Sequence, residues 1–405
     1  MATYKEQNKL NVPHLRFPEF QGEWEKHGLS EYLDFKNGLN PDSKRFGKGI
    51  KFISVMDILN NPVITYDCIR ASVQATDAEI SSFSVENGDI LFQRSSETLE
   101  DVGRANVYID DRVAVFGGFV IRGKKKANYN PLFFRYLLSS PYARKRIIPM
   151  GAGAQHFNIG QEGLSKVLLN FPSIEEQTKI ASLLHLLDER IATQSKLIED
   201  LKKLKSAIID YAINSLDTDF AKFGSLYEMA GEGGTPATSN ASFYDNGKIP
   251  FIKIDDLKKK YLTENKDFIT ELGLQKSSAW LVPSRSILFS NGATIGEITI
   301  TTYPVSTKQG ILGIVPKPNI NVEFLYYFMS SSYFKKAVSR IVTEGTMKTA
   351  YLKDINNIRC PIPIKEKQQD IAKMPSALNS KIDFEQSILK RFCSQKQYLL
   401  RQMFM

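Results

Sequence analysis

The sequence predicts an α+β protein built from two related domains and two long helices. Three observations support this fold class. Residues 130–142 and 321–333 are closely similar, about 190 residues apart, and shorter matches on both sides follow the same order. Each copy mixes β-rich runs with a helical run, and each is followed by a long segment with helical spacing of apolar residues. The copies exceed the roughly 20 to 50 residues of a solenoid repeat, so each should have its own core.

Shorter matches extend the repeat along both copies. Lys51–Ile58 corresponds to Pro250–Leu257, Gly88–Phe92 to Arg285–Phe289, and Glu176–Ile180 to Lys367–Ile371. From these matches we predict a first domain at residues 1–172, a central helical region at 173–216, a second domain at 217–364 and a distal helical region at 365–405.

Inside each domain, β-branched and aromatic runs bounded by glycine turns predict strands. The predicted strands lie at Ile50–Met56, Val85–Phe92 and Val113–Ile121 in the first domain, and near Pro250–Ile254, Ser286–Phe289 and Gly310–Val315 in the second. One helix is predicted in each domain, near Pro131–Arg146 and near Val322–Val342.

The central helical region begins with a capping-box pattern, Ser173-Ile174-Glu175-Glu176. Its roughly 35 residues would span roughly 50 Å as a helix, much longer than a small domain needs for its own core. The expected apolar seam consists of Ile180, Leu184, Leu187, Ile191, Ile198, Leu201 and Ile208 here, and of Leu378, Ile382, Leu389, Phe392 and Leu399 in the distal region. The spacing predicts an antiparallel coiled coil within the chain.

Two alternatives to intrachain pairing stay open. Each helix could pack on its own domain, or the seam could join two copies of the chain. Pro375 occupies the place of Leu184 in the second copy, and a proline in a helix interior costs about 3 kcal/mol. We therefore expect the distal helix either to kink at Pro375 or to begin at Ser376.

Composition favours a soluble, cytosolic protein with a polyanionic partner. The formal net charge is +9, with 42% apolar and 24% charged residues. The three cysteines are far apart and predict neither disulfides nor a zinc site. We expect neither a signal peptide nor a membrane-spanning helix, because the first residues are polar and apolar runs are short.

Catalytic motifs are absent, and the four histidines lack the spacing of metal ligands. Asn130-Pro131-Leu132-Phe133 approximates the Asn-Pro-Pro-Phe/Tyr motif of adenine methyltransferases, but the second proline is missing and no glycine-rich cofactor loop precedes it. Helix initiation at Pro131 is the better interpretation. The run Gly231–Gly234 is interpreted as a flexible turn.

Polar and basic residues between the apolar runs are the candidates for contact with nucleic acid, since phosphates attract Lys and Arg and base edges need forked donors and acceptors. A solvated surface would explain many of them equally well. The candidates are Lys44, Arg45, Lys48, Arg94, Ser95, Lys124, Lys125, Lys126, Gln155, His156 and Asn158 in the first domain, and Thr235, Lys253, Asn291, Lys308, Gln309, Thr346, Lys348 and Tyr351 in the second.

Several segments together carry a family resemblance. They are Val12–Phe20 with Trp24, Lys51–Ser54, Gly88–Phe92, and Phe171–Gln177 leading to Leu187–Ile191. With them the chain resembles, over nearly its full length, the DNA-specificity subunit of Type I restriction-modification enzymes.

The resemblance implies a non-catalytic subunit in which two target-recognition domains each read one half of a split sequence in double-stranded DNA. It also implies an antiparallel coiled coil that fixes the gap and docks two modification (methyltransferase) subunits, which restriction (motor-nuclease) subunits join. This chain is then expected to bind no metal or cofactor, while S-adenosylmethionine, ATP and Mg²⁺ belong to the partner subunits. The recognition loops differ between the halves, which implies two different half-sites.

Two other classes of function remain as alternatives. A self-contained DNA-modifying or DNA-cleaving enzyme is one, although the sequence lacks the carboxylate and lysine signature of a metal-dependent nuclease. A coiled-coil adaptor for proteins alone is the other, and it would not need basic loops in both domains.

Overall fold

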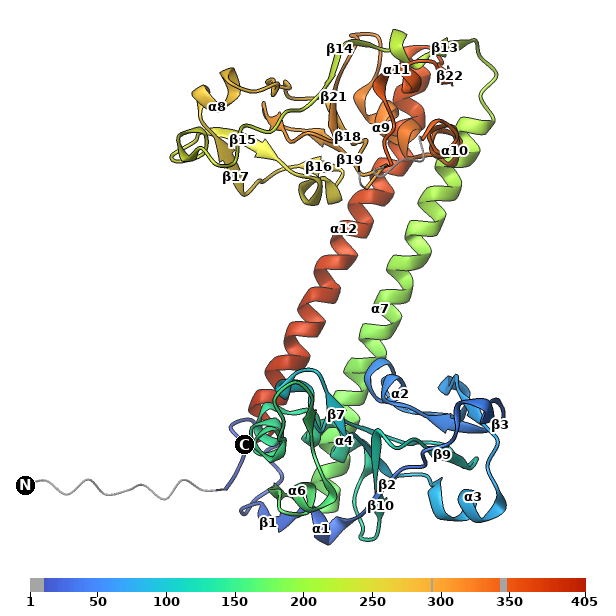
Figure 1. Cartoon of the computed structure of the whole chain (residues 1–405), viewed down its shortest axis with the longest axis vertical. Helices are drawn as coiled ribbons and strands as arrows, with labels where there is room; N and C mark the ends of the chain where they lie inside the picture. The colour runs from blue at the N-terminus through green and yellow to red at the C-terminus, as the bar shows by residue number, and fades with distance from the viewer. Residues whose placement is uncertain (1–10, 293, 343–347) are drawn as a thin grey trace, which may run out of the picture. The chain divides into compact units, whose positions relative to one another are not determined.

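The computed structural model describes residues 11–292, 294–342 and 348–405 (Figure 1). The chain divides into two compact units. Unit 1 contains Met1–Gln194 and Ile388–Met405, and unit 2 contains Ser195–Ser387. Two long helices, α7 (Ile174–Asn214) and α12 (Lys365–Gln402), contribute a part to each unit. No helix in the described part of the chain has the length and apolar character of a membrane span.

The strands of unit 1 form two four-stranded sheets and two short pairs. One sheet is antiparallel and has the order β2 (Leu33–Asn37), β10 (Val120–Lys125), β6 (Ile90–Gln93), β8 (Ala105–Val107). The other has the order β4 (Ser72–Val73), β3 (Phe46–Ile53), β9 (Ala114–Phe116), β5 (Ser84–Val85), with β3 and β9 parallel. The pairs are β1 (Glu25–Gly28) with β12 (Leu168–Phe171), and β7 (Ser95–Ser96) with β11 (Phe157–Asn158).

Unit 2 has a five-stranded sheet, a three-stranded sheet and one short pair. The larger sheet has the order β14 (Tyr227–Glu232), β21 (Ile311–Pro316), β18 (Ile287–Ser290), β19 (Ile298–Thr301), β16 (Tyr261–Leu262). The smaller has the order β17 (Asp267–Ile269), β15 (Ile249–Ile252), β20 (Ser306–Thr307). The pair is β13 (Phe220–Lys222) with β22 (Arg359–Pro361).

Short helices connect the strands in both units. In unit 1 they are α1 (Leu29–Tyr32), α2 (Val55–Asn60), α3 (Asp77–Phe83) and α6 (Gln161–Ser165); in unit 2 they are α8 (Glu271–Gln275) and α11 (Leu352–Ile355). The mixed helix and strand content and the repeated modules confirm the predicted α+β class.

The prediction of one helix in the middle of each module is wrong. Unit 1 has α4 (Pro131–Ser139) followed by α5 (Pro141–Ile147), and unit 2 has α9 (Val322–Ser330) followed by α10 (Ser332–Ile341). The break falls at Ser140 and Ser331, whose backbones are extended and whose hydroxyls each accept a hydrogen bond from the backbone N–H three residues later. A serine in this position caps a new helix.

Helix initiation at Asn130-Pro131 is confirmed. Asn130 caps α4, with its side-chain oxygen 3.0 Å from the Phe133 backbone nitrogen, and Pro131 lies in the first turn. Asn321 caps α9 in the same way, 3.0 Å from the Phe324 nitrogen, although no proline follows it. Proline lacks an N–H, and the first turn of a helix has no partner for one. The motif therefore serves the fold in both units.

The interpretation of Gly231–Gly234 as a flexible turn is wrong for its first half. Gly231 lies inside β14, which ends at Glu232. A side chain at Gly231 would come within 3.2 Å of the Trp280 indole nitrogen, and one at Gly233 within 2.2 Å of the Thr307 carbonyl. The glycines let the strand approach its neighbours closely.

In unit 1 the first part of α7 packs on its own module and on the end of α12. Ile180, Leu184, Leu187 and Leu399 share a core with Trp24, Phe133, Met403 and Phe404, and Ile191 and Phe392 pack partly buried against it. Leu389 is half-buried. The beginning of one long helix therefore meets the end of the other, which is an antiparallel arrangement.

Unit 2 contains the second part of α7 and the first part of α12. Ile198 and Ile382 are buried, and Leu201, Ile208 and Leu378 are half-buried. Ile209 and Ile213 join the core of this unit with Phe289, Phe324 and Phe328. Pro375 is buried inside α12, so the expectation that the helix begins at Ser376 is wrong.

A polar contact joins the two long helices in each unit. In unit 1, Lys396 pairs with Asp188, which also accepts a hydrogen bond from the Tyr136 hydroxyl at 2.8 Å and pairs with Arg135 at 3.2 Å. Burial raises the pKa of Asp188, whereas Lys396, Tyr136 and Arg135 lower it, and the net direction is downward. At pH values above the ordinary pKa of a carboxyl, Asp188 is therefore charged and its ion pair with Lys396 helps to hold the two helices together.

The corresponding contact between the two helices in unit 2 joins a lysine to a neutral asparagine. Lys205 donates to the side-chain oxygen of Asn379 at 3.0 Å, and Asn379 takes the place of Asp188 in the repeat. Burial lowers the pKa of Lys205. The repeat thus keeps the lysine and loses the carboxylate.

Candidate nucleic-acid interface

Three segments of unit 1 meet at the end of the buried central strand β6. Arg94 follows this strand, and its backbone N–H donates to the Phe119 carbonyl at 2.9 Å. Its carbonyl accepts from the Ile159 N–H at 2.9 Å. The turn before β10 and the loop after β11 are therefore both fixed to the same residue.

The loop at residues 151–158 presents polar side chains beside Arg94. Asn158 pairs with Ser95 between β11 and β7, and the Ser95 hydroxyl donates to the Asn158 side chain. Ala152 and Asn158 close the loop with backbone bonds of 2.9 and 2.8 Å. Gly153 has a φ of 144°, and a side chain there would come within 1.9 Å of the His156 carbonyl, so only glycine fits. Gln155, His156 and Asn158 are left exposed.

An exposed aromatic residue at this site was missed by the sequence analysis. Phe119 is 69% exposed, and the Arg94 guanidinium donates to the Gly118 carbonyl next to it at 3.2 Å. A side chain at Gly118 would come within 1.7 Å of the Asn40 side-chain oxygen. The Gly117-Gly118-Phe119 run was a usable signal, because glycines that allow close approach of the backbone leave the next side chain on the surface.

Unit 2 builds the same junction with different side chains. Asn291 follows β18, its N–H donates to the Gly310 carbonyl at 3.0 Å, and its carbonyl accepts from the Ala350 N–H at 2.9 Å. The Asn291 side chain is 1% exposed and donates to the Ala350 carbonyl at 3.3 Å. In unit 2 the side chain of Asn291 is therefore buried, and it stabilises the segment at Ala350 by a hydrogen bond.

Exposed polar groups surround this second junction. Lys308 and Gln309 are exposed, and the Gln309 N–H donates to the Thr235 hydroxyl at 3.3 Å. The parallel pairing of Ile252 with Thr307 brings Lys253 close to Lys308, although Lys253 also pairs with Asp267 at 2.8 Å. Exposed Lys348 and the 46% exposed Tyr351 flank Ala350. Thr346 lies outside the described residues.

A buried glutamine connects the unit 1 module to α7. The Gln177 side-chain oxygen accepts from the Asn130 N–H at 3.1 Å, and its nitrogen donates to the Pro172 carbonyl at 3.0 Å. Gln177 is 3% exposed. Since Asn130 also caps α4, one side chain fixes the start of α4 against the start of the long helix.

Gln368 makes the same connection in unit 2. Its side-chain oxygen accepts from the Asn321 N–H at 2.8 Å, and its nitrogen donates to the Pro363 carbonyl at 2.8 Å. Gln368 is 1% exposed. We call these two arrangements the glutamine latches. They set the position of each module on the long helix that follows it.

The model of the "Type I restriction modification DNA specificity domain" family matches residues 21–203 and 217–391, one match for each copy of the repeat. The chain belongs to this family. Both matches run from a β-rich module into a long helix, as the two units do.

Several type I specificity subunits are similar to this chain over most of their length. The putative MjaX specificity subunit of Methanocaldococcus jannaschii is 23% identical, with 94% of this chain and 92% of that protein covered. The HindI specificity subunit of Haemophilus influenzae is 22% identical, covering 73% and 80%. The type I S subunit of M. genitalium has the same fold, with a TM-score of 0.58, 17% identity and coverage of 97% and 99%.

A further solved structure supports the fold of this type I specificity subunit. It comes from work on complex assembly and conformational transition of the type I R-M system, and matches with a TM-score of 0.59, 14% identity and coverage of 94% and 97%. These findings confirm the family resemblance and the architecture with two specificity domains.

Several candidate lysines and arginines of this specificity subunit already have partners within unit 1. The Arg45 guanidinium binds Glu79 and lowers the pKa of that carboxyl to about 2. Lys124 pairs with Glu86 at 2.8 Å. Lys125 donates to the Tyr129 carbonyl at 3.2 Å. The remaining candidates, Lys44, Lys48 and Lys126, are exposed.

Strand geometry separates the Lys124–Lys126 run from Arg94. Val120 pairs with Gln93 next to Arg94, whereas Lys125 pairs with Leu33 at the other end of β10. At about 3.3 Å per residue, the two ends of that strand are roughly 17 Å apart. The structure therefore brings together Arg94, Ser95, Gln155, His156 and Asn158, and leaves the lysine run elsewhere.

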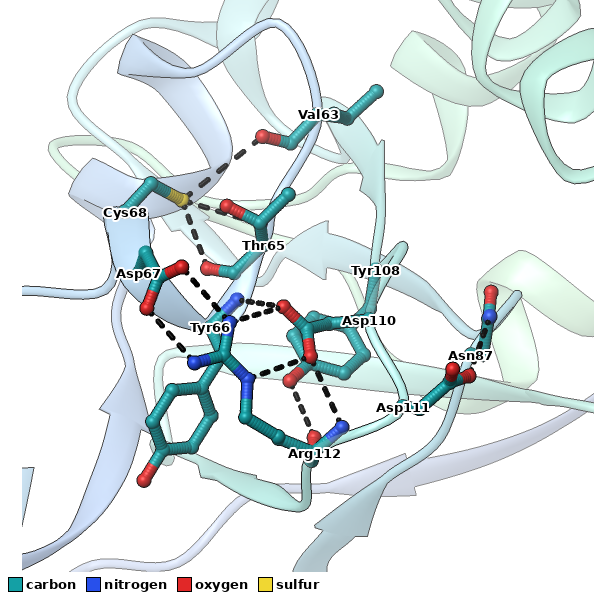
Figure 2. A network of polar contacts seen from close by, with 10 residues as sticks. All are labelled: Val63, Thr65, Tyr66, Asp67, Cys68, Asn87, Tyr108, Asp110, Asp111 and Arg112. Atoms are coloured by element: carbon teal, nitrogen blue, oxygen red, sulfur yellow. Dashed lines mark hydrogen bonds and ion pairs between the residues drawn. The ribbon is translucent and has the colours of Figure 1, made fainter.

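Arg112 is a basic residue already neutralised by its neighbours. Figure 2 shows its guanidinium between Asp67 and Asp110, with hydrogen bonds of 2.9 to 3.0 Å to both carboxylates, and it lies 4.5 Å from the centre of the Tyr66 ring. The Arg112 hydrogen bonds lower the pKa of Asp110 and Asp67. Two carboxylates and one guanidinium leave a net negative cluster, which is unsuited to a phosphate contact.

Metal-ligating side chains do not cluster in the described part of the chain, where no group of three His, Cys, Asp or Glu residues is arranged to hold an ion. Cys360 is buried, and burial raises the pKa of its thiol to about 12. A thiol protonated at neutral pH is a poor nucleophile and a poor metal ligand.

Proposed function

We propose that this type I specificity subunit reads a bipartite DNA target, with each unit reading one half-site. One observation carries the proposal: in both units the residue after the central strand, Arg94 or Asn291, is tied by backbone hydrogen bonds to two loops that differ between the repeats. A common scaffold with exchanged loop side chains is what the recognition of two different half-sites requires.

The side chains at the two junctions suit DNA contact. Arg94 has forked donors for a guanine edge, and the amides of Asn158 and Gln309 match an adenine edge. Lys308 and Lys348 are exposed lysines that suit phosphate oxygens. The formal charge of +9 predicts that binding weakens as salt concentration rises.

In the same proposal, α7 and α12 set the distance between the half-sites and dock two modification subunits. Exposed apolar side chains on these helices support a protein partner: Leu186, Leu197 and Leu204 on α7, and Met374 and Phe384 on α12 are 41 to 61% exposed. S-adenosylmethionine for adenine methylation then belongs to the modification subunits, and ATP and Mg²⁺ to the restriction subunits. The chain acts in the cytoplasm and makes or breaks no bond itself.

Mapping methylated adenines in cells with and without this gene tests the proposal. The expected result is a split sequence that loses methylation when the gene is deleted. Exchanging residues 24–171 for the same region of a relative should change one half of that sequence and leave the other half and the gap unchanged. Methylation that does not depend on the gene, or an exchange that alters both halves, contradicts the proposal. So does DNA cleavage or methylation by the purified chain alone.

A further inference from the structure

An open groove in unit 2 lies where α7 ends and α12 begins. Tyr211, Leu216, Pro363, Ile364 and Ile371 give it apolar walls, Lys367 and Asp217 are the charged residues that line it, and its volume is about 550 Å³. Tyr211 is 77% exposed and Ile364 is 73% exposed. Two large apolar side chains with this exposure, on the two walls of one groove, form a surface that suits a partner.

The repeat identifies the corresponding place in unit 1, and there it is filled. Pro363, Ile364, Lys367 and Ile371 correspond to Pro172, Ser173, Glu176 and Ile180. Over this part of unit 1 lies the segment before β1, residues 15–22, which we call the arm. The backbone of the arm is tied to α12 by a bond of 2.8 Å from the Leu15 N–H to the Gln402 carbonyl.

Aromatic packing and charge pairs hold the arm. Arg16 donates to both carboxylate oxygens of Glu176, at 2.8 and 2.7 Å. Phe17 packs against the core of unit 1, and the Lys179 ammonium lies 4.9 Å from the centre of its ring. Lys179 also pairs with Glu19. The occupant of this place in unit 1 is therefore an irregular segment with a turn at Pro18–Glu19, and it carries an aromatic residue next to a charge opposite to that of Glu176.

Among the described residues of unit 2, no segment corresponds to the arm. The chain passes from the end of α7 to β13 within residues 215–219, and the Thr218 hydroxyl donates to the Ile362 carbonyl at 3.2 Å. The charges at the corresponding positions are exchanged, since Lys367 replaces Glu176 and Asp370 replaces Lys179. Lys367 therefore favours an occupant that carries a carboxylate where the arm carries Arg16.

We propose that this groove binds a short peptide segment of a partner protein, with an aromatic side chain next to a carboxylate. The aromatic ring packs between Tyr211 and Ile364, and the carboxylate pairs with Lys367. The inference goes beyond the proposed function, because it depends on the precedent of the arm and not on the reading of DNA.

The arm supplies the probe for the test. Two fluorescent peptides of residues 11–23, one with the native sequence and one with Arg16→Glu, are titrated into the full-length chain and followed by anisotropy. The Arg16→Glu peptide should bind at least five-fold more tightly than the native peptide. In the chain variant Lys367→Glu this preference should reverse. In Lys390→Glu, a matched change at an exposed lysine of α12 outside the groove, the preference should stay as in the wild type.

A second variant tests the apolar half of the groove. Ile364→Glu changes an exposed side chain, so folding is retained, and it should weaken the Arg16→Glu peptide at least ten-fold. Failure of both peptides to bind overturns the proposal. So does a preference that Lys367→Glu leaves unchanged, or tighter binding of the native peptide to the wild-type chain, which would point to the arm of a second copy.

Discussion

Replacing either latch glutamine with leucine should destabilise one unit and leave the other intact. Leucine keeps the approximate volume of glutamine and removes both of its hydrogen-bonding groups. Gln177→Leu leaves the Asn130 N–H and the buried Pro172 carbonyl without a partner, and Gln368→Leu does the same to Asn321 and Pro363. A buried polar group that loses its partner costs about 1 to 3 kcal/mol.

Two such groups, one of them only partly buried, amount to about 3 kcal/mol for each variant. In a unit of this size about 1 kcal/mol shifts the melting temperature by roughly 2 to 4 °C, so a loss of about 6 to 12 °C is expected. A chain of two units has no single unfolding free energy, so the measurement must be local. Hydrogen exchange followed by mass spectrometry meets this need. Gln177→Leu should speed exchange in α4, and Gln368→Leu should speed exchange in α9.

Gln369→Leu is the matched control, because Gln369 is exposed and adjacent to Gln368 on the same helix. It should change neither the melting temperature of unit 2 nor exchange in α9. If Gln368→Leu proves no more disruptive than this control, the latch does not hold α9 on α12. Equal effects of Gln177→Leu on α4 and α9 would refute the claim that each latch acts within its own unit.

Three further variants test other parts of the structure. Removing the carboxylate in Glu176→Ala leaves the Arg16 guanidinium without its buried partner and should cost unit 1 about 3 kcal/mol, measured by thermal unfolding; an unchanged melting temperature would contradict this. Asp188 has a lowered pKa in the folded state, so its contribution is present above the unfolded value of about 3.9 and is lost as pH falls through the folded value. In Asp188→Asn the stability of unit 1, measured by denaturation between pH 2 and 6, should therefore fall less steeply as the pH is lowered. A pH dependence equal to that of the wild type would show that Asp188 does not stabilise unit 1 through its charge. Phe119→Ala should weaken binding to the target DNA about ten-fold with no change in melting temperature, because the ring is 69% exposed; unchanged anisotropy titrations would remove Phe119 from the interface.

The sequence predicts those structural features in which a side chain forms a hydrogen bond with the backbone a few residues away. Asn130 and Asn321 cap helices three residues away, and the pattern that marks such a cap lies within one turn. The same logic applied to Ser140 and Ser331 would have placed the helix breaks correctly. The apolar matches of the repeat obscured that signal, because they continue across both breaks.

The features that the sequence did not predict depend on contacts between residues far apart in the chain. Lys124 is engaged by Glu86 and Arg45 by Glu79, residues more than thirty positions away, and nothing in the spacing indicated these pairs. Asn291 is polar and follows a strand, yet it is buried, where its side chain donates to the Ala350 carbonyl 59 residues away. Glycines marked the loop at residues 151–158, whereas its position beside Arg94 depends on the pairing of β7 with β11.

The discontinuous make-up of unit 1 has a consequence for biosynthesis. Its hydrophobic core includes Leu399, Met403 and Phe404, which are synthesised after the whole of unit 2, because unit 2 is complete once Ser387 has emerged. During translation Trp24 and Phe133 stay uncovered until Phe404 has been made, so unit 1 completes its core only after unit 2 has been synthesised. A chain that stops before Leu399 would therefore leave these aromatic rings exposed to solvent, a surface of the kind that promotes aggregation.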